Sequence, residues 1–131
     1  MLVEQYRMNT LIMQWSSTHM YEDRLLAHPS VSARVLRDIL PTQLAEDEEA
    51  SELSQIPLVF IDTAGSLMYE EVDQEVGKHE SKFNFGEVDL VIQMIKELIT
   101  IGTPEKSIGV ITPYSAQGSE IRKQLKFLDI G

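Results

Sequence analysis

Residues Leu58–Ile61, LVFI, form a continuous apolar run of the length of a β-strand. The run is apolar on both faces, which is typical of a strand covered by helices on each side of a parallel sheet. The residues DTAG at Asp62–Gly65 follow directly and predict a turn, in which glycine supplies a free choice of φ. The sequence therefore predicts a buried strand that ends at Ile61.

C-terminal to this strand, the hydrophobic pattern predicts a helix, a second strand and a second helix. Val88–Ile99 repeats apolar residues at helical spacing, Asn84 stands where the N-cap of this helix would be, and Gly102 stands where it would end. Ile108–Ile111 is a second apolar run of strand length, and apolar residues recur at helical spacing over residues 121–128. This order of elements is a βαβα unit, which implies parallel strands.

N-terminal to the first strand, the predicted elements are shorter. Met1–Tyr6 alternates loosely, as a short strand would, and Asn9 suits the N-cap of a helix that runs towards Tyr21. Residues 30–40 predict a further short helix, which ends at Pro41. Together these elements predict the α/β class, with a three-layer parallel sheet.

The composition suits one compact domain with an uneven charge. The chain has 131 residues, 43% of them hydrophobic, and no cysteine, which excludes disulfides and a Cys nucleophile. The net charge of −10 arises between Glu46 and Glu80, where eleven acidic residues occur with one basic residue. Clustered like charges resist packing, so acidic loops are predicted near residues 42–56 and 66–80. No apolar segment has the length of a signal peptide or membrane span, so we expect an intracellular protein of the nucleus or cytoplasm.

Two other classes of site are disfavoured. The DTAG turn resembles a switch motif of small GTPases, but no glycine is followed by Lys and Ser or Thr, as a phosphate-binding loop requires. The histidines His19, His28 and His79 lie far apart in the sequence and share no metal-ligand spacing. The sequence therefore predicts neither a GTPase nor a metal site.

The residues QYRMN at Gln5–Asn9 are the strongest candidate for a binding site. They place Arg7 and the adjacent Tyr6 between the end of a strand and the start of a helix. In an open α/β sheet this is the edge at which ligands bind, where an arginine can reach a phosphate and a tyrosine can lie against a base. A surface salt bridge of Arg7 explains the pattern equally well at this point.

Five ordered motifs resemble those of the second RecA-like domain of superfamily-one helicases of the Upf1-like group. They span almost the whole chain, which makes the resemblance specific. The motifs are Gln5–Asn9 with Ile12–Met13 and Trp15–Ser17, Met20–Tyr21 with Ala27–Val31, Phe60–Gly65, Ser81–Asn84 with Glu87, and Ile111–Tyr114 with Gln117.

The resemblance implies an ATP site between two RecA-like domains, of which the first supplies the phosphate loop and the carboxylates for magnesium. Arg7 would be the catalytic residue, an arginine finger that contacts the terminal phosphate. Gln5, Tyr6 and Arg7 would bind nucleotide, with Tyr6 packed on the adenine. ATP and magnesium would thus be bound mainly by the first domain.

The resemblance also implies a nucleic-acid track. Thr112, Pro113 and Tyr114 would contact a single strand, and Asn84 is a further candidate for the same face. The implied parent protein is an ATP-dependent helicase that moves 5′ to 3′ along RNA or DNA. Its implied partners are ATP, the strand and the first RecA-like domain of the same chain, without a membrane.

Several motifs of such helicases are missing from the sequence. The phosphate loop, the acidic box and two later motifs do not occur in residues 1–131. We therefore expect residues 1–131 to be a partial second RecA-like domain that does not hydrolyse ATP by itself. One alternative stays open, namely a non-catalytic, truncated helicase-like module that binds a protein partner.

Overall fold

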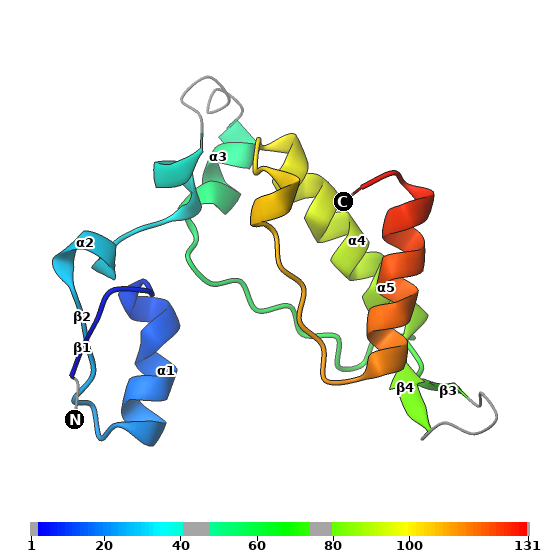
Figure 1. Cartoon of the computed structure of the whole chain (residues 1–131), viewed down its shortest axis with the longest axis horizontal. Helices are drawn as coiled ribbons and strands as arrows, with labels where there is room; N and C mark the ends of the chain where they lie inside the picture. Colours follow the sequence, from blue (N-terminus) through cyan, green and yellow to red (C-terminus); the bar gives the residue numbers. More distant parts are fainter. Residues whose placement is uncertain (1–2, 41–47, 74–79, 131) are drawn as a thin grey trace. The chain divides into compact units, whose positions relative to one another are not determined.

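The computed structural model describes residues 3–40, 48–73 and 80–130 (Figure 1). The chain divides into two compact units, an N-terminal unit, Met1–Ile61, and a C-terminal unit, Asp62–Gly131. Both units combine helices with short strands, as the α/β class requires. No helix among these residues is long and apolar enough to cross a lipid bilayer.

The N-terminal unit is built on two parallel strands joined by a helix. Strand β1 (Glu4–Gln5) pairs with strand β2 (Leu26–Ala27). Helix α1 (Thr10–Met20) runs between them and packs against β2. Parallel neighbours need such a long crossover, because a hairpin turn would reverse the strand direction. The strand predicted at the N-terminus is confirmed over two residues, whereas β2 has no counterpart in the sequence prediction.

Local signals in the sequence fix the position of α1. Asn9 is its N-cap, with Oδ1 accepting a hydrogen bond at 2.9 Å from a backbone N–H of the first turn. Met13 and Ser17 are buried on the inner face, and the Ser17 hydroxyl donates to the carbonyl of Leu25 at 3.2 Å. The predicted cap and the predicted end near Tyr21 are both confirmed.

Residues 30–40 form two short turns instead of the single helix that the sequence predicts. Helix α2 spans Pro29–Ser32, and the 3-10 helix η1 spans Leu36–Ile39. Between them, the carbonyl of Arg34 accepts a hydrogen bond at 2.9 Å from the side chain of Asn9. This carbonyl is therefore directed to a different element, which ends the helical path at that point.

Helix α3 (Glu48–Gln55) lies where the sequence predicts an acidic loop, so that prediction is wrong for these residues. The segment is rich in Glu, Ala, Leu and Gln, which favour helix, and α3 packs against η1. Helix propensity and this packing outweigh the repulsion between like charges. The remainder of the predicted loop up to residue 47 lies outside the described residues.

The C-terminal unit packs two helices and a short ribbon together. Its elements are β3 (Glu71–Asp73), β4 (Ser81–Phe83), α4 (Phe85–Thr100), the 3-10 helix η3 (Glu105–Ser107) and α5 (Ser115–Phe127). The strands β3 and β4 pair antiparallel, and α5 packs against both α4 and β4. Apolar side chains three or four positions apart form the core between the helices: Val88, Val91, Ile92, Ile121, Leu125 and Leu128.

The sequence predicts a second acidic loop at residues 66–80, but strand β3 lies within this segment. Residues 71–73 pair with β4, with Val72 opposite Lys82. An ion pair at 2.6 Å between Lys82 Nζ and the carboxylate of Glu70 compensates part of the acidic charge. The loop prediction is therefore wrong for residues 71–73, and residues 74–79 lie outside the described residues.

Helix α4 begins and ends as the sequence predicts. Asn84 caps its N-terminus, with Oδ1 accepting a hydrogen bond at 3.2 Å from the backbone N–H of Glu87. At the other end Gly102 has a φ of +95°, and the N–H of Thr103 donates to the carbonyl of Leu98 at 2.9 Å. This Schellman motif favours glycine because the residue after the helix takes a positive φ.

The two central strands predicted at Leu58–Ile61 and Ile108–Ile111 are wrong, because neither segment is a strand. Their side chains are largely exposed, including 87% of Phe60 and 98% of Ile111. A strand needs a partner for its backbone groups, and neither run pairs with one within the described parts of the chain. The βαβα unit does not form over these segments, and a three-layer parallel sheet is not observed among the described residues. The turn after residue 61 does form, with a φ of +79° at Gly65.

Candidate functional site

The loop between β1 and α1, which carries Tyr6 and Arg7, is held at its start by Gln5. The Gln5 Oε1 atom accepts hydrogen bonds from the backbone N–H groups of Arg7 at 2.8 Å and Met8 at 2.7 Å. Its Nε2 atom donates to the carbonyl of Met8 at 2.8 Å. The Gln5 amide is thus engaged with the loop itself, so its role in this site is to shape the backbone around Arg7.

The end of the same loop is held by Asn9. Its Oδ1 atom caps α1, and its Nδ2 atom donates to the carbonyl of Arg34. Asn9 is only 8% exposed, so these bonds lie away from competing water. Two amide side chains, one on each side, therefore fix the short path that presents Tyr6 and Arg7.

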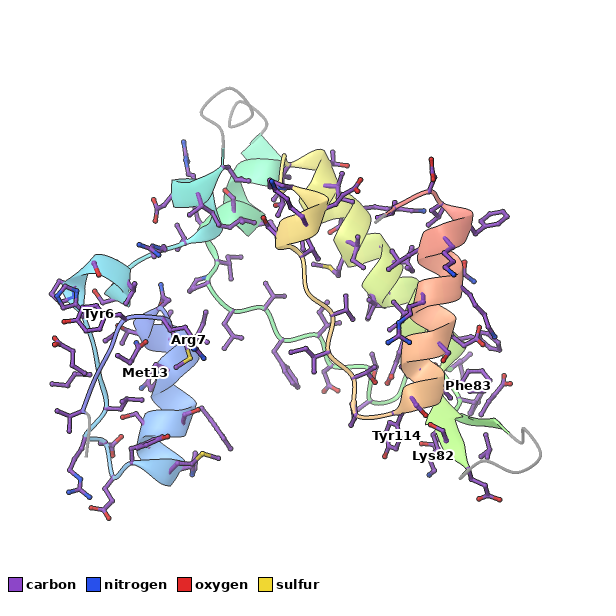
Figure 2. All side chains as sticks on the ribbon, in the orientation of Figure 1. Tyr6, Arg7, Met13, Lys82, Phe83 and Tyr114 are labelled. Atoms are coloured by element: carbon purple, nitrogen blue, oxygen red, sulfur yellow. The ribbon has the colours of Figure 1, made fainter. Side chains whose placement is uncertain are left out.

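The Arg7 side chain is exposed at the carboxyl end of β1. No ion pair joins its guanidinium to a carboxylate in the described part of the chain. The surface salt bridge that the sequence leaves open is thus not observed among these residues. Figure 2 shows Tyr6 and Arg7 on different sides of the loop. A free, planar cation at this position is suited to binding the oxygens of a phosphate group.

Tyr6 is also exposed, and two contacts hold it. Its hydroxyl donates a hydrogen bond to the Glu4 carboxylate at 3.1 Å, and this bond raises the pKa of Tyr6 above its ordinary value. Its ring stacks on the imidazole of His28, with the ring centroids 4.2 Å apart. The ring therefore offers a flat surface for an aromatic ligand.

In the C-terminal unit, Thr112, Pro113 and Tyr114 form the turn that leads into α5. The Thr112 hydroxyl oxygen accepts a hydrogen bond from the backbone N–H of Tyr114 at 3.3 Å. Tyr114 is the N-cap residue of α5 and is 48% exposed. The turn thus presents an aromatic ring at a helix N-terminus, where backbone dipoles favour anionic groups.

Asn84 lies close to this turn through the network that joins α4 and α5. Its backbone N–H donates to Oε1 of Gln117, which is 8% exposed, at 2.7 Å. The Ser81 hydroxyl accepts a hydrogen bond at 3.0 Å from the N–H of Ala116 and so caps α5 from a neighbouring strand. The side-chain oxygen of Asn84 caps α4, so the structure gives this residue a clear structural role.

The candidate residues therefore fall into two groups. Gln5, Tyr6 and Arg7 lie together in the N-terminal unit. Asn84 and the Thr112–Tyr114 turn lie together in the C-terminal unit. No three His, Asp or Glu side chains gather closely enough to hold a metal ion within residues 3–40, 48–73 and 80–130.

Sequence analysis misses two residues at these sites. His28 contacts Tyr6 through the pairing of β1 with β2; it lies within the motif Ala27–Val31, but the motif does not indicate this contact. Lys82 on β4 lies near Tyr114, and its hydrogen bond to Glu70 raises the pKa of the ammonium group. Lys82 lies within the motif Ser81–Asn84, but the motif does not by itself indicate that this lysine lies near Tyr114.

We expect Gln5→Leu to lower the free energy of unfolding by about 1–3 kcal/mol, because the N–H groups of Arg7 and Met8 lose their acceptor. Urea unfolding of the chain, followed by circular dichroism, measures this change. The matched control is Gln14→Leu, at an exposed position of α1, with an expected effect within about 0.5 kcal/mol. Identical unfolding curves for the two variants would contradict the role assigned to Gln5.

The family model AAA_12, which describes an AAA domain, matches residues 1–129. The chain belongs to this family of AAA domains. The match covers both candidate groups, so the loop with Arg7 and the turn with Tyr114 are parts of one family domain.

Proteins with similar sequences agree with this family assignment. The chain is 43% identical over 130 residues to the DNA polymerase alpha-associated DNA helicase A of Saccharomyces cerevisiae, covering 96% of this chain and 19% of that protein. It is 42% identical to the DNA-binding protein SMUBP-2 of Mesocricetus auratus, covering 95% of this chain and 12% of that protein. An uncharacterized ATP-dependent helicase of Methanocaldococcus jannaschii is 31% identical, with 91% and 17% covered. The chain thus spans less than a fifth of the length of these relatives.

Proposed function

We propose that this chain is part of the second RecA-like domain of an ATP-dependent helicase, and that it supplies the arginine-finger side of the ATP site. The observation that carries the proposal is the Arg7 side chain, which is exposed on a loop held by Gln5 and Asn9. These bonds fix the backbone of the loop and leave the guanidinium without an ion pair to the described residues. Membership of the AAA domain family and relatives named as helicases support this role.

The role of Arg7 is to bind the terminal phosphate of ATP that is held mainly by another domain of the complete protein. Its planar guanidinium stabilises the negative charge that develops as the phosphoryl group is transferred. In this proposal the magnesium ligands belong to the first RecA-like domain, as the resemblance to superfamily-one helicases implies.

Tyr6 takes the adenine in this proposal, and Gln5 acts on the nucleotide through the loop that it shapes. A nucleotide carries its base and its terminal phosphate at opposite ends, so Tyr6 and Arg7 can serve one molecule from different sides of the loop (Figure 2). The exposed ring of Tyr6 and the exposed cation of Arg7 suit these two ends.

The nucleic-acid track is formed by Thr112, Pro113 and Tyr114, with Asn84 fixing the neighbouring helix start. The exposed Tyr114 ring stacks on a base. Lys82 supplies a positive charge for the phosphates when its ion pair with Glu70 breaks. The complete helicase moves 5′ to 3′ along single-stranded RNA or DNA in the nucleus or cytoplasm. Its partners are ATP, the strand and its own first RecA-like domain, without a membrane.

The three-layer parallel sheet belongs to the complete domain in this proposal. The apolar runs Leu58–Ile61 and Ile108–Ile111 become its strands when further strands supply their hydrogen-bond partners. Their exposed apolar side chains are the support for this view, because exposed apolar surface of this extent favours burial against other elements.

Binding of a labelled single-stranded oligonucleotide to the chain tests the proposed track. We expect association that weakens as salt increases, and an approximately tenfold loss of affinity in Tyr114→Ala, because base stacking on an aromatic ring contributes about 1–3 kcal/mol. The matched control is Phe127→Ala, which removes an exposed aromatic ring from the opposite end of α5. Fluorescence anisotropy measures both affinities.

The absence of salt-sensitive binding would argue against the track and in favour of a non-catalytic module that binds a protein partner. Equal losses in Tyr114→Ala and Phe127→Ala would also argue against it, since the effect would then not be specific to the turn. For the ATP site, a phosphate loop encoded upstream of this segment and an arginine motif downstream are expected.

A further inference from the structure

The Tyr6 ring has an aromatic partner that the proposed ATP site does not include. His28 stacks on it with ring planes inclined by 25°, and the Glu4 carboxylate holds its hydroxyl. The ring is thus fixed on one face and at its tip, while 61% of the residue is still exposed. This leaves the second face of the ring as the surface that a flat ligand can use.

His28 is itself fixed by the fold. Its backbone N–H donates to the carbonyl of Gln5 at 2.9 Å, next to the last paired residues of β1 and β2. Its Nδ1 atom accepts a hydrogen bond from the N–H of Ser30 at 3.1 Å and lies 2.8 Å from the Ser30 hydroxyl. Because Nδ1 is the acceptor, the neutral ring carries its proton on Nε2. The strand pairing brings the imidazole to Tyr6, and the cap of α2 sets the plane of the imidazole.

An exposed tyrosine that must stack on a base loses side-chain freedom when it binds. This loss weakens binding unless the ring is already held in place. The contacts to His28 and Glu4 hold the ring before any ligand arrives, and they leave one face open. Prior ordering of one side chain corresponds to about a three- to tenfold gain in affinity.

We propose that His28 is a positioning residue that supports the Tyr6 ring from behind, so that the free face of the ring stacks on the base of the bound nucleotide. This inference rests on the proposed contact of Tyr6 with the base. It predicts that loss of the imidazole ring weakens binding of the base and leaves the contact of Arg7 with the terminal phosphate unaffected.

Two substitutions test separately the two features of His28, namely its aromatic ring and its side-chain acceptor at the N-cap of α2. His28→Asn keeps a side-chain acceptor for the N–H of Ser30, because asparagine is a good N-cap, but it has no aromatic ring. His28→Phe keeps an aromatic ring but has no acceptor. Tyr6→Ala removes the stacking surface itself. The variants are made in the complete protein and titrated with 2-aminopurine riboside triphosphate, whose fluorescence falls when its base stacks.

We expect His28→Asn to weaken binding of this nucleotide about three- to tenfold and to reduce the fluorescence quench, whereas His28→Phe binds within about twofold of the unmodified protein. In ATP hydrolysis, His28→Asn raises KM by the same factor and leaves kcat within about twofold, since the step at the terminal phosphate does not involve the base.

A purely structural role predicts the opposite order, because His28→Phe loses the cap of α2 and would then be the weaker variant. Unchanged or tighter binding in His28→Asn also overturns the inference; tighter binding would mean that the imidazole covers the face used by the base. Tyr6→Ala tests the proposed role of Tyr6 separately from the inference about His28. If it leaves binding unchanged, the proposed role of Tyr6 fails. If it weakens binding and His28→Asn does not, only the inference about His28 fails.

Discussion

Replacement of Arg7 by alanine is expected to lower the rate of ATP hydrolysis of the complete protein by about a thousandfold or more. The guanidinium is exposed and forms no ion pair with the described residues, so its removal disturbs no observed internal ion pair. Binding of a single strand is expected to stay largely intact, because the proposed track lies in the other unit. Steady-state ATPase assays at saturating oligonucleotide, together with anisotropy titrations, measure both quantities.

Two further substitutions sharpen this test. Arg7→Lys keeps the positive charge but not the planar pair of donors, so we expect it to recover only part of the rate. Arg34→Ala removes an exposed arginine of the same unit, whose guanidinium donates to the carbonyl of Ser30 at 3.2 Å, and is expected to hydrolyse ATP normally. Near-normal turnover in Arg7→Ala, or equal losses in Arg7→Ala and Arg34→Ala, would count against the arginine finger.

Replacement of Ile92 by alanine is expected to lower the free energy of unfolding of the C-terminal unit by about 2–5 kcal/mol. Ile92 is 7% exposed and packs with Val88 and Ile121 in the core between α4 and α5. Its truncation loses buried apolar surface and leaves a cavity that the two capped helices cannot readily close. Urea unfolding monitored by circular dichroism measures the change.

The control for this prediction is Lys96→Ala, one turn further along α4 on an exposed position. We expect its effect to be within about 0.5 kcal/mol, because alanine retains helix propensity and no core contact is lost. A loss of less than 1 kcal/mol in Ile92→Ala, on the order of a surface substitution, would show that the packing of α4 on α5 contributes little to stability.

The helices could be predicted from the sequence because their signals are local. Asn9 and Asn84 cap α1 and α4 as expected, and Gly102 ends α4 with the positive φ that glycine favours. Each of these residues acts on backbone groups within a few positions, so a single sequence contains the information. Helix α3 is not predicted, because its clustered like charges disfavour packing and its contact with η1 depends on the tertiary structure.

The strands could not be predicted in the same way, because a strand depends on a partner that can lie far away in the chain. The apolar runs at residues 58–61 and 108–111 have strong strand patterns but no strand partner among the described residues. By contrast, Leu26–Ala27 forms a strand because it meets Glu4–Gln5, although its own sequence carries little strand signal. A hydrophobic pattern alone thus identifies a segment that can become a strand, but not the partner that the strand needs.

The sequence indicates which residues form the candidate site, but it does not indicate the hydrogen bonds and ring contacts that hold them. Arg7 stands out by its position between a strand and a helix. The bonds that hold its loop come from Gln5, whose amide folds back on the next residues, and from Asn9, which reaches Arg34. The stack of His28 on Tyr6 depends on the pairing of β1 with β2, which the sequence did not indicate.

The pairing of β1 with β2 also bears on how the protein is synthesised. The segment from Gln5 to Ala27 is short, so closing it costs little chain entropy, and its contact order is low. During synthesis on a ribosome, the loop that carries Arg7 can be fixed once Arg34 has emerged, because the carbonyl of Arg34 is the most C-terminal group that holds this loop. The nascent chain can therefore fold this loop before most of the C-terminal unit has been synthesised.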